Sequence, residues 1–494
     1  MFRRFRFMGR SLFIALSLLL IVSIAATAAP LLQSTTKRLS TNFTVVNLGA
    51  NEASVTARYI RPDGSTWVAA PGNTQFTVAA NFGQKAIAQY FDETLSEGMG
   101  SVVLESNEPL GAVVQIQARN QTPTNGAYSG VVNPANSFLI PQALRQRNTR
   151  NGVANTQIAI QSAEASGAIN VNVQLIPYPG SGLPAHTERI TNIQPGASFL
   201  YDLATEDQIP AGWYGSAVVT AESGNISVVV NIFTGENSIQ VFNAFPATGV
   251  ASRWFVPQFT SRLPNGLSTP VVVQNLSGRT LNPGNIVLDC NSATYTPRTF
   301  SVTNDVAVQD QASYVFNPVE DTRLPDNWSG ACNVTLSGNA SGVVFVQMRR
   351  PGVSEEFAAY EAFPATATDT RVVVPLVSKR QPNGFATVVT VQNLDTNNPA
   401  EVRFRYVPSA EYIAGGGSSS EITRTVTIPP GGNQQDNHRL PDGVAGMPDR
   451  WYGTLVVEPV NPANARPLVA YVQLTNYLGA PGDTLMAHSA FTLP

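Results

Sequence analysis

Short runs in which apolar and polar residues alternate dominate the chain. Val55, Ala57 and Tyr59 alternate with polar residues, and residues 402–406 show the same pattern far downstream. A period of two residues is typical of a β-strand with one buried face. The runs end at Gly, Pro, Asn and Asp, which favour turns. Outside the amino-terminal segment we find no sustained helical period, so the pattern predicts an all-β protein.

Distant parts of the chain resemble one another. Each part has a strand-like run that ends in Gln-Asn-Leu or a related sequence, at residues 44–48, 158–162, 272–276 and 390–394. An alternating run follows each of them, at residues 55–59, 171–175, 286–290 and 402–406. Equivalent positions are about 115 residues apart, which is too long for a solenoid repeat and suits a whole domain.

A step from tryptophan to glycine marks the later half of three copies. Trp213, Trp328 and Trp451 each stand two positions before a glycine and lead into a further apolar run. Because they share the alternation phase of the core residues that follow, we expect them to fill the core. The first copy departs from this pattern, since Gly98 stands where the tryptophan is expected.

The repeat predicts the domain organisation. About seven short strands in about 110 residues each need to bury one face. Two packed antiparallel sheets achieve this, so we expect four tandem immunoglobulin-like or fibronectin-like β-sandwiches, with a small closed barrel as the alternative. The predicted repeats cover residues 36–138, 139–250, 254–368 and 371–494.

The amino terminus has the features of a secretory signal peptide. Arg3, Arg4 and Arg6 precede an apolar run from Leu12 to Ala26, and Ala26-Thr27-Ala28 suits a signal peptidase. We therefore expect residues 1–28 to be a signal peptide and the remainder to be secreted or at the cell surface. The alternative is an uncleaved anchor, because the apolar run is only slightly shorter than a membrane span. The chain would then meet the membrane only through this leader.

Cys290 and Cys332 are the only cysteines. In an oxidising compartment, two thiols in one domain predict a disulfide. The repeat alignment places both at core-facing positions of two different strands. We expect a bridge that ties the third repeat across its core and contributes on the order of 3–4 kcal/mol. A reactive or metal-binding pair is the alternative.

Composition argues against several classes of function. Charged residues make up 13% of the chain and the net charge is −3, against an average charged share of about 25%. This composition predicts no binding to nucleic acid. The chain has three histidines, and we find no nucleophile-elbow or zinc-ligand motif. We therefore expect a protein without catalytic activity, metal site or cofactor.

Two groups of residues are candidates for contact with a partner. Trp67 and Trp254 lie outside the repeat pattern and form a candidate contact surface. Basic residues recur near the start of each repeat, either as linker and ion-pair residues or as a stripe for an anionic glycan or wall polymer. This basic set comprises Lys37, Arg38, Arg145, Arg147, Arg150, Arg262, Lys379 and Arg380.

The Val-Gln-Asn-Leu strand end at residues 391–394 and the Pro-Asp-x-Trp-x-Gly step at residues 325–330 define the style of the repeat. From about Thr36 to its end, the chain resembles bacterial secreted or cell-surface proteins built of tandem immunoglobulin-like modules. It differs from antibody domains, because Trp328 lies just before Cys332. We find no functional signature in these motifs.

These features predict a structural or adhesive protein in which tandem sandwiches form a rod. A cell-surface protein or a polysaccharide is the expected kind of partner. The alternative is a secreted, lectin-like protein that binds carbohydrate through exposed aromatic side chains.

Overall fold

The computed structural model describes residues 38–118, 121–367 and 369–493, and β-strands are their main regular element. The expected signal peptide and Lys37 lie outside the described residues. The helices are short: α1 (Pro71–Thr74), α2 (Ala410–Ala414), and the 3₁₀ turns η1 (Gln89–Phe91), η2 (Leu203–Thr205), η3 (Ala247–Gly249) and η4 (Pro462–Asn464). Over these ranges, no helix has the length and apolar character that a membrane crossing needs.

Repeats 1 and 2 supply the first half of the strands. Repeat 1 contains β1 (Leu39–Asn47), β2 (Ala53–Ile60), β3 (Gln75–Val78), β4 (Gln84–Ile87), β5 (Ser101–Ser106), β6 (Leu110–Ala118) and β7 (Asn125–Ser129). Repeat 2 contains β8 (Ser137–Arg145), β9 (Arg147–Thr149), β10 (Gly152–Ser162), β11 (Ile169–Pro177), β12 (His186–Ile193), β13 (Ser198–Asp202), β14 (Trp213–Ala221), β15 (Ile226–Thr234), β16 (Ser238–Asn243) and β17 (Phe245–Pro246).

Repeats 3 and 4 supply the second half. Repeat 3 contains β18 (Arg253–Ser261), β19 (Val271–Asn275), β20 (Ile286–Asn291), β21 (Thr299–Thr303), β22 (Ser313–Phe316), β23 (Trp328–Leu336), β24 (Gly342–Arg349), β25 (Phe357–Glu361) and β26 (Phe363–Pro364). Repeat 4 contains β27 (Arg371–Ser378), β28 (Phe385–Asn393), β29 (Ala400–Pro408), β30 (Ile422–Ile428), β31 (Asn433–Asn437), β32 (Tyr452–Pro459), β33 (Leu468–Asn476), β34 (Met486–Ser489) and β35 (Phe491–Leu493).

The strands form antiparallel sheets, two in each repeat, which confirms the predicted all-β class of tandem sandwiches. One sheet has the same main strand order in every repeat, and we call it the axial sheet: β4-β1-β6-β7, β13-β10-β15-β16, β22-β19-β24-β25 and β31-β28-β33-β34. The second sheet also recurs, as β12-β11-β14-β8-β17, β21-β20-β23-β18-β26 and β30-β29-β32-β27-β35. Repeat 1 has only β3-β2-β5 among its described residues.

The recurring asparagine explains how strands β1 and β19 of the axial sheets end. The side-chain amide of Asn47 donates to the carbonyl of Val78, and that of Asn275 donates to the carbonyl of Val308, at 3.1 and 3.0 Å. The side-chain oxygen of Asn275 accepts the backbone N–H of Ser277. A buried asparagine thus pairs backbone groups that leave the ladder at the turn. The motif is recurrent for a structural reason.

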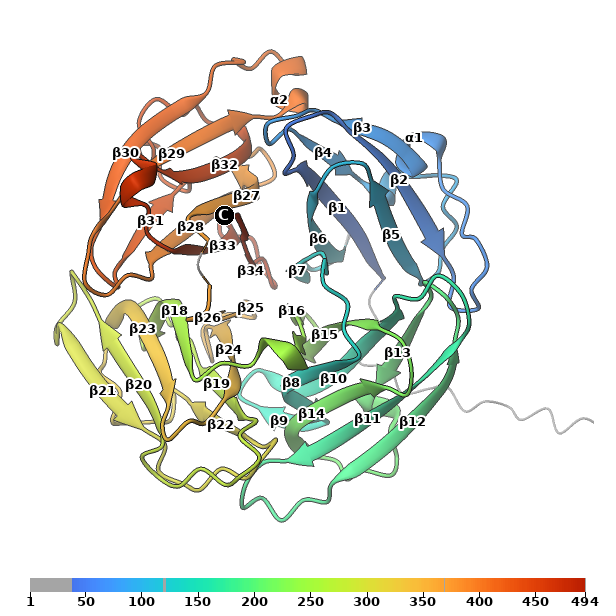
Figure 1. The fold of residues 1–494 in the computed structure, drawn as a ribbon, viewed down its shortest axis with the longest axis vertical. Helices are drawn as coiled ribbons and strands as arrows, with labels where there is room; N and C mark the ends of the chain where they lie inside the picture. Colours follow the sequence, from blue (N-terminus) through green and yellow to red (C-terminus); the bar gives the residue numbers. More distant parts are fainter. Residues whose placement is uncertain (1–37, 119–120, 368, 494) are drawn as a thin grey trace, which may run out of the picture.

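The four sandwiches close into a ring (Figure 1). Strands β7, β16, β25 and β34 lie around its centre, and each packs mainly against the two strands beside it. Strand β34 of the last repeat contacts β7 of the first, so the cycle is complete. The rod expected from the sequence is therefore wrong, and repeats 1 and 4 are neighbours.

A common contact joins most neighbouring repeats. The first strand of one repeat packs on the axial sheet of the next: β8 on β19 and β24, β18 on β28 and β33, and β27 on β1 and β6. The hydroxyl of Ser313 donates to the carbonyl of Pro141 across the boundary between repeats 2 and 3, at 2.7 Å. The buried apolar cores of repeats 2 and 3 merge into one cluster.

Hydrogen bonds of polar groups link the repeats at the centre of the ring. The carboxylate of Asp483 accepts backbone N–H groups from Ile239 of repeat 2, at 2.9 Å, and from Phe357 of repeat 3, at 3.0 Å. The backbone N–H of Asp483 donates to the carbonyl of Pro123 in repeat 1. Asn125 donates to the carbonyl of Asp483 at 2.9 Å. One buried aspartate therefore contacts all three other repeats.

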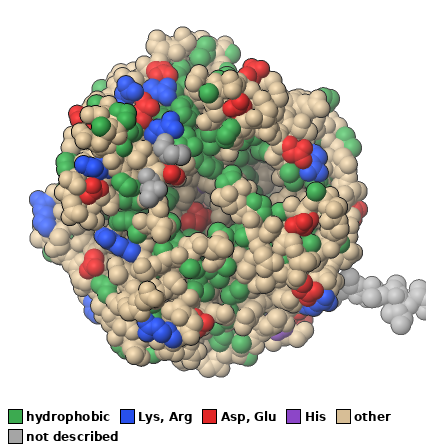
Figure 2. Space-filling model, viewed as in Figure 1, with side chains coloured by type: hydrophobic (Ala, Val, Ile, Leu, Met, Phe, Trp, Pro, Cys, Tyr) green, Lys and Arg blue, Asp and Glu red, His purple; other side chains and the backbone are tan. Residues whose placement is uncertain are grey.

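The last residues of the four central strands, β7, β16, β25 and β34, form a second polar ring. The hydroxyl of Ser129 donates to the carbonyl of Ser489, whose hydroxyl donates to Glu361, at 2.7 and 2.8 Å. The backbone N–H of Asn243 also donates to Glu361, and its amide donates to the carbonyl of Ser129. Each repeat contributes one residue to this closed cycle. Figure 2 shows a mostly uncharged face with a central hollow and an acidic side chain inside it.

Candidate functional site

The repeated tryptophans are core residues, as expected. Trp213, Trp328 and Trp451 are 0%, 0% and 1% exposed. The indole N–H of Trp213 donates to the carbonyl of Pro184, and that of Trp328 donates to the carbonyl of Pro297, at 2.8 and 2.7 Å. All three rings fill the interior of a sandwich, so none of them is a platform for a sugar.

Trp254 is not a contact surface. It lies on β18, is 1% exposed, and its indole N–H donates to the carbonyls of Ala251 and Gly342. The strand positions equivalent to it are Phe138 and Val372, which are also buried. The expectation of a free tryptophan at this position is therefore wrong. Its place on the buried face of a first strand accounts for its burial.

Trp67 remains partly accessible and takes the place of the missing core tryptophan of repeat 1. A Cβ atom added at Gly100 would lie 2.8 Å from the Trp67 ring, and one added at Gly98 would lie 3.5 Å from it. Gly330 and Gly453, at the position equivalent to Gly100, approach the rings of Trp328 and Trp451 in the same way. Repeat 1 thus fills the same space with a tryptophan from a different loop.

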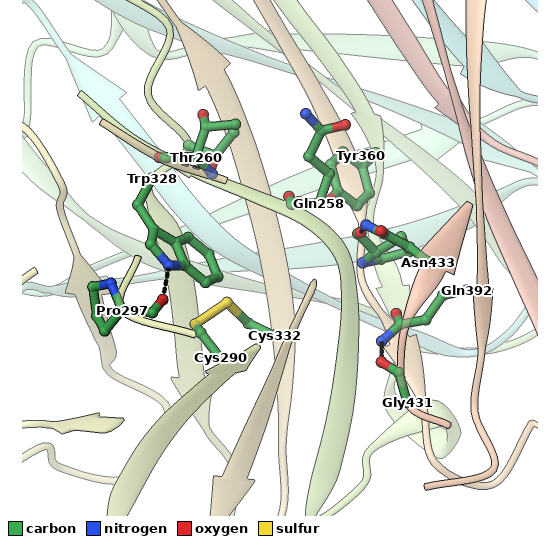
Figure 3. Close-up of a disulfide and its surroundings, with 12 residues drawn as sticks. Gln258, Thr260, Cys290, Pro297, Trp328, Cys332, Tyr360, Gln392, Gly431 and Asn433 are labelled. Carbon is green, nitrogen blue, oxygen red and sulfur yellow. Dashed lines mark hydrogen bonds between the residues drawn. A yellow bond between two sulfur atoms is a disulfide. The ribbon is translucent and has the colours of Figure 1, made fainter. Parts of the chain in front are cut away.

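Cys290 and Cys332 form a disulfide in repeat 3 (Figure 3). The two residues are direct partners in the ladder between β20 and β23, with 4.0 Å between their Cα atoms. The pairing is as expected, but the bridge links neighbouring strands of one sheet. The expected bridge across the core of repeat 3 is therefore wrong. Both strands belong to the second sheet, so the bridge does not join the two sheets.

Most basic residues at the starts of the repeats serve their own repeat. Arg262 pairs with Asp326 and donates to the carbonyls of Pro318 and Leu324. Lys379 is 1% exposed and donates to the carbonyl of Met447 at 2.6 Å. Arg380 pairs with Asp449, Arg145 with Asp207, and Arg38 with Glu97. A continuous basic stripe is therefore not formed by these residues.

Arg147 and Arg150 differ from the rest of this set, because both are exposed and line a cleft between repeats 2 and 3. They lie on an insertion. Repeats 3 and 4 connect their first two strands through Pro-Asn-Gly turns, whereas repeat 2 adds β9, which pairs back onto β10. At the tip, the amide of Asn151 donates to the carbonyl of Ser354 in repeat 3 at 2.9 Å. The insertion therefore bridges to the next repeat.

The cleft has a volume of about 360 Å³ and a mixed polar and apolar lining. Repeat 3 contributes Arg349 at the end of β24, and Glu320 also lies on the lining. Arg349 donates one hydrogen bond to Asn317 at 2.9 Å, while its Nε is buried and has no hydrogen-bond partner within the described structure. At the equivalent positions the other repeats have Gln117, Phe233 and Thr475.

Burial is the main influence on Arg349, and it lowers the pKa of the guanidinium to about 10. The charge of Arg150 lowers this pKa further, while Glu320 raises it. The group remains a cation at neutral pH, and its desolvation favours an anionic partner.

A tyrosine pair forms an aromatic wall of the cleft. The rings of Tyr178 and Tyr214 stack with their centroids 5.3 Å apart and their planes 25° from parallel. The guanidinium of Arg147 lies 4.1 Å from the centroid of Tyr214, which is a cation–π contact. Burial raises the pKa of Tyr178 to about 12, so its hydroxyl stays protonated and can donate a hydrogen bond.

Guanidinium groups, an aromatic wall and side-chain amides can together bind an anionic sugar or a similar polyanion. Sequence reasoning identified Arg147 and Arg150 as basic residues but did not single them out, and it missed Arg349, Tyr178 and Tyr214. The available signals were the longer first turn of repeat 2 and the arginine at a position that is uncharged in the other repeats.

No protein-family model matches the chain, and no curated protein is significantly similar to it.

Proposed function

We propose that the protein is a non-catalytic, extracytoplasmic adhesive protein that binds an anionic polysaccharide or wall polymer in the cleft between repeats 2 and 3. The export signal in the sequence supports the location, and the disulfide in repeat 3 is compatible with it. The single observation that carries the binding site is the largely buried Arg349, whose Nε has no partner among the described residues, beside Arg147, Arg150 and a stacked tyrosine pair.

The ring supports an adhesive function in a different way from a rod. The repeats fasten one another through Asp483 and through the contacts of their first strands, so the inserted hairpin of repeat 2 is presented against a fixed neighbour. A preorganised cleft loses less conformational entropy on binding than a mobile loop does. The chain needs no separate binding domain to hold a polymer under this proposal.

Binding of an acidic polysaccharide such as polygalacturonate, with dextran as the neutral comparison, tests the proposal by calorimetry. Arg349→Gln and Arg150→Gln should each weaken polygalacturonate binding by about tenfold or more, because each removes a charge-assisted contact. Arg298→Gln is the matched control, since Arg298 is exposed on repeat 3 away from the cleft lining. Equal binding by all three variants, or equal affinity for dextran, would refute the proposed site.

A second candidate function is binding of neutral carbohydrate next to Trp67. A pocket of about 330 Å³ is lined by Trp67, Arg58 and Tyr59 of repeat 1 and reaches Pro195 of repeat 2. The other four tryptophans are at most 1% exposed, so a change in fluorescence on adding an oligosaccharide reports mainly on Trp67. An unchanged spectrum, or the same change in Trp67→Phe, would exclude this second function.

A further inference from the structure

Three side chains with metal-binding atoms converge at the rim of repeat 2. They are His186 and Glu188 on β12 and Glu206, which follows η2. One atom from each lies within 4.8 Å of the others. His186 and Glu188 are two positions apart on a strand and therefore project from the same face. The cluster thus joins β12, the edge strand of the second sheet, to the segment after η2, which follows strand β13 of the axial sheet.

The distances are too long for hydrogen bonds and suit a shared ion. The Nε2 atom of His186 is 3.7 Å from an oxygen of Glu188 and 4.0 Å from an oxygen of Glu206. Two ligands at about 2.0–2.2 Å from one tetrahedral ion lie about 3.3–3.6 Å apart. A movement of a few tenths of an ångström would bring the three groups onto one ion.

The Nε2 atom of His186 faces both carboxylates of the cluster. It is buried, and within the described structure it has no hydrogen-bond partner. The side chains of His186 and Glu206 are 11% and 12% exposed, and that of Glu188 is 34% exposed. A largely buried imidazole nitrogen that faces two carboxylates is placed to share a cation with them.

Neighbouring groups position Glu206 but leave the cluster with excess negative charge. Its Oε1 accepts the backbone N–H of Gln208 at 3.0 Å, and its Oε2 accepts the hydroxyl of Tyr201 at 3.1 Å. Arg145 is the nearby cation, and it pairs with Asp207 instead.

The cluster belongs to repeat 2 alone among the repeats whose second sheet has the same strand order. The ladder registers place Phe300 and Val302 of repeat 3 at the positions of His186 and Glu188. In repeat 4 these positions hold Ile422 and Arg424. Repeat 3 has no charged group here, and repeat 4 has a cation that pairs with Asp436. The sandwich therefore does not need an imidazole and carboxylates at these positions, and their presence in repeat 2 calls for a separate explanation.

We propose that His186, Glu188 and Glu206 form a binding site for a divalent transition-metal ion of the Zn²⁺ class. One imidazole and two carboxylates are ligands that Zn²⁺ takes, and three protein ligands leave one coordination position for water or a further ligand. The ion neutralises both carboxylates and clamps the edge strand β12 to the segment after η2. This site is separate from the cleft, and its existence does not depend on the proposed function.

Calorimetry with Zn²⁺ on the metal-stripped, full-length exported chain tests the site. We expect one ion per chain. Glu188→Gln and Glu206→Gln should each weaken Zn²⁺ binding by about tenfold or more, and His186→Ala should abolish it. Glu236→Gln is the control, because Glu236 is an exposed carboxylate of the same repeat. Circular dichroism of each variant without metal establishes that it is folded.

Nuclear magnetic resonance of the imidazole gives a second readout that does not depend on a variant. Zn²⁺ should shift the ring resonances of His186 and leave those of the buried His438 and His488 unchanged. The proposal is overturned if Zn²⁺ at up to about 100 µM leaves the His186 resonances in place, which makes the cluster an ion pair only. It is also overturned if Zn²⁺ binds equally well to the folded His186→Ala chain.

Discussion

The carboxylate of Asp483 accepts the backbone N–H of Ile239 at 2.9 Å, although the two residues are 244 positions apart. This bond links repeat 4 to repeat 2 at the centre of the ring. The other carboxylate oxygen accepts the N–H groups of Phe357 and Leu485, at 3.0 and 3.2 Å. Three buried backbone donors therefore depend on one side chain, and the ring depends on a residue near the end of the chain.

Replacing Asp483 should destabilise the whole ring. Asp483→Ala leaves three buried N–H groups without an acceptor, and each such group costs about 1–3 kcal/mol. We expect a loss of several kcal/mol in the free energy of unfolding, measured by denaturant titration. Asp289→Ala is the control, since Asp289 is exposed on β20. Similar unfolding midpoints for the two variants would mean that Asp483 does not fasten the ring.

Acid should weaken the fold through two buried histidines. Burial lowers the pKa of His438 and of His488 from 6.5 to about 4. Between about pH 4 and pH 6.5, the unfolded chain therefore binds protons more readily than the folded chain does. The contribution of each histidine to the free energy of unfolding is fully present above pH 6.5 and is lost as the pH falls to about 4. The loss is on the order of 3 kcal/mol for each histidine.

Thermal melting at pH 7 and at pH 4.5 measures this effect. Carboxylates also titrate in this range, so the comparison is with the double variant His438→Gln, His488→Gln. That variant should lose less stability between the two pH values than the parent chain, even if it is less stable at pH 7. An equal loss in both proteins would show that these histidines do not control the acid response.

Reduction of the disulfide should lower the stability of repeat 3. The bridge closes a segment with a sequence separation of 42 residues, and loss of such a closure costs on the order of 3–4 kcal/mol. Cys290→Ala, Cys332→Ala should melt at a lower temperature than the parent, and dithiothreitol should not lower it further. If the parent and the double variant melt together, the bridge makes no net contribution.

The two candidate tryptophans of the sequence analysis should behave differently. Trp254→Ala removes a fully buried ring and should cost about 3–5 kcal/mol of stability. Trp67→Ala should cost less, because the ring is partly exposed and packs on glycines at the surface of repeat 1. Denaturant titration of both variants measures the difference, and a larger loss for Trp67→Ala would contradict this assignment.

Local patterns in the sequence were sufficient for the fold class, the tryptophan cores and the pairing of the cysteines. Alternation and turn residues depend on neighbours along the chain, so one repeat predicts the next. Trp254 was misread, although Phe138 and Val372 at the equivalent positions mark it as a core residue. Trp254 lies outside the tryptophan–glycine step but still occupies a core position of the repeat.

The ring and the cleft could not be predicted in the same way. Arg147 and Arg349 come together only because repeat 2 packs on repeat 3. Apart from charged groups such as Asp483 and Glu361, the surfaces that pack are mostly uncharged, and they carry no periodic signal beyond that of each strand. The contact of Asp483 with Ile239 likewise has no local signature, since an aspartate before an apolar run also reads as a turn residue.

Small-angle X-ray scattering of residues 29–494 tests the closed ring most directly. A compact particle of about 460 residues has a radius of gyration of about 23 Å, whereas four sandwiches in a row give about 40 Å. We predict a value near 23 Å that Asp483→Ala increases under mildly destabilising conditions. A value near 40 Å for the parent chain would contradict the ring and remove the cleft between repeats 2 and 3.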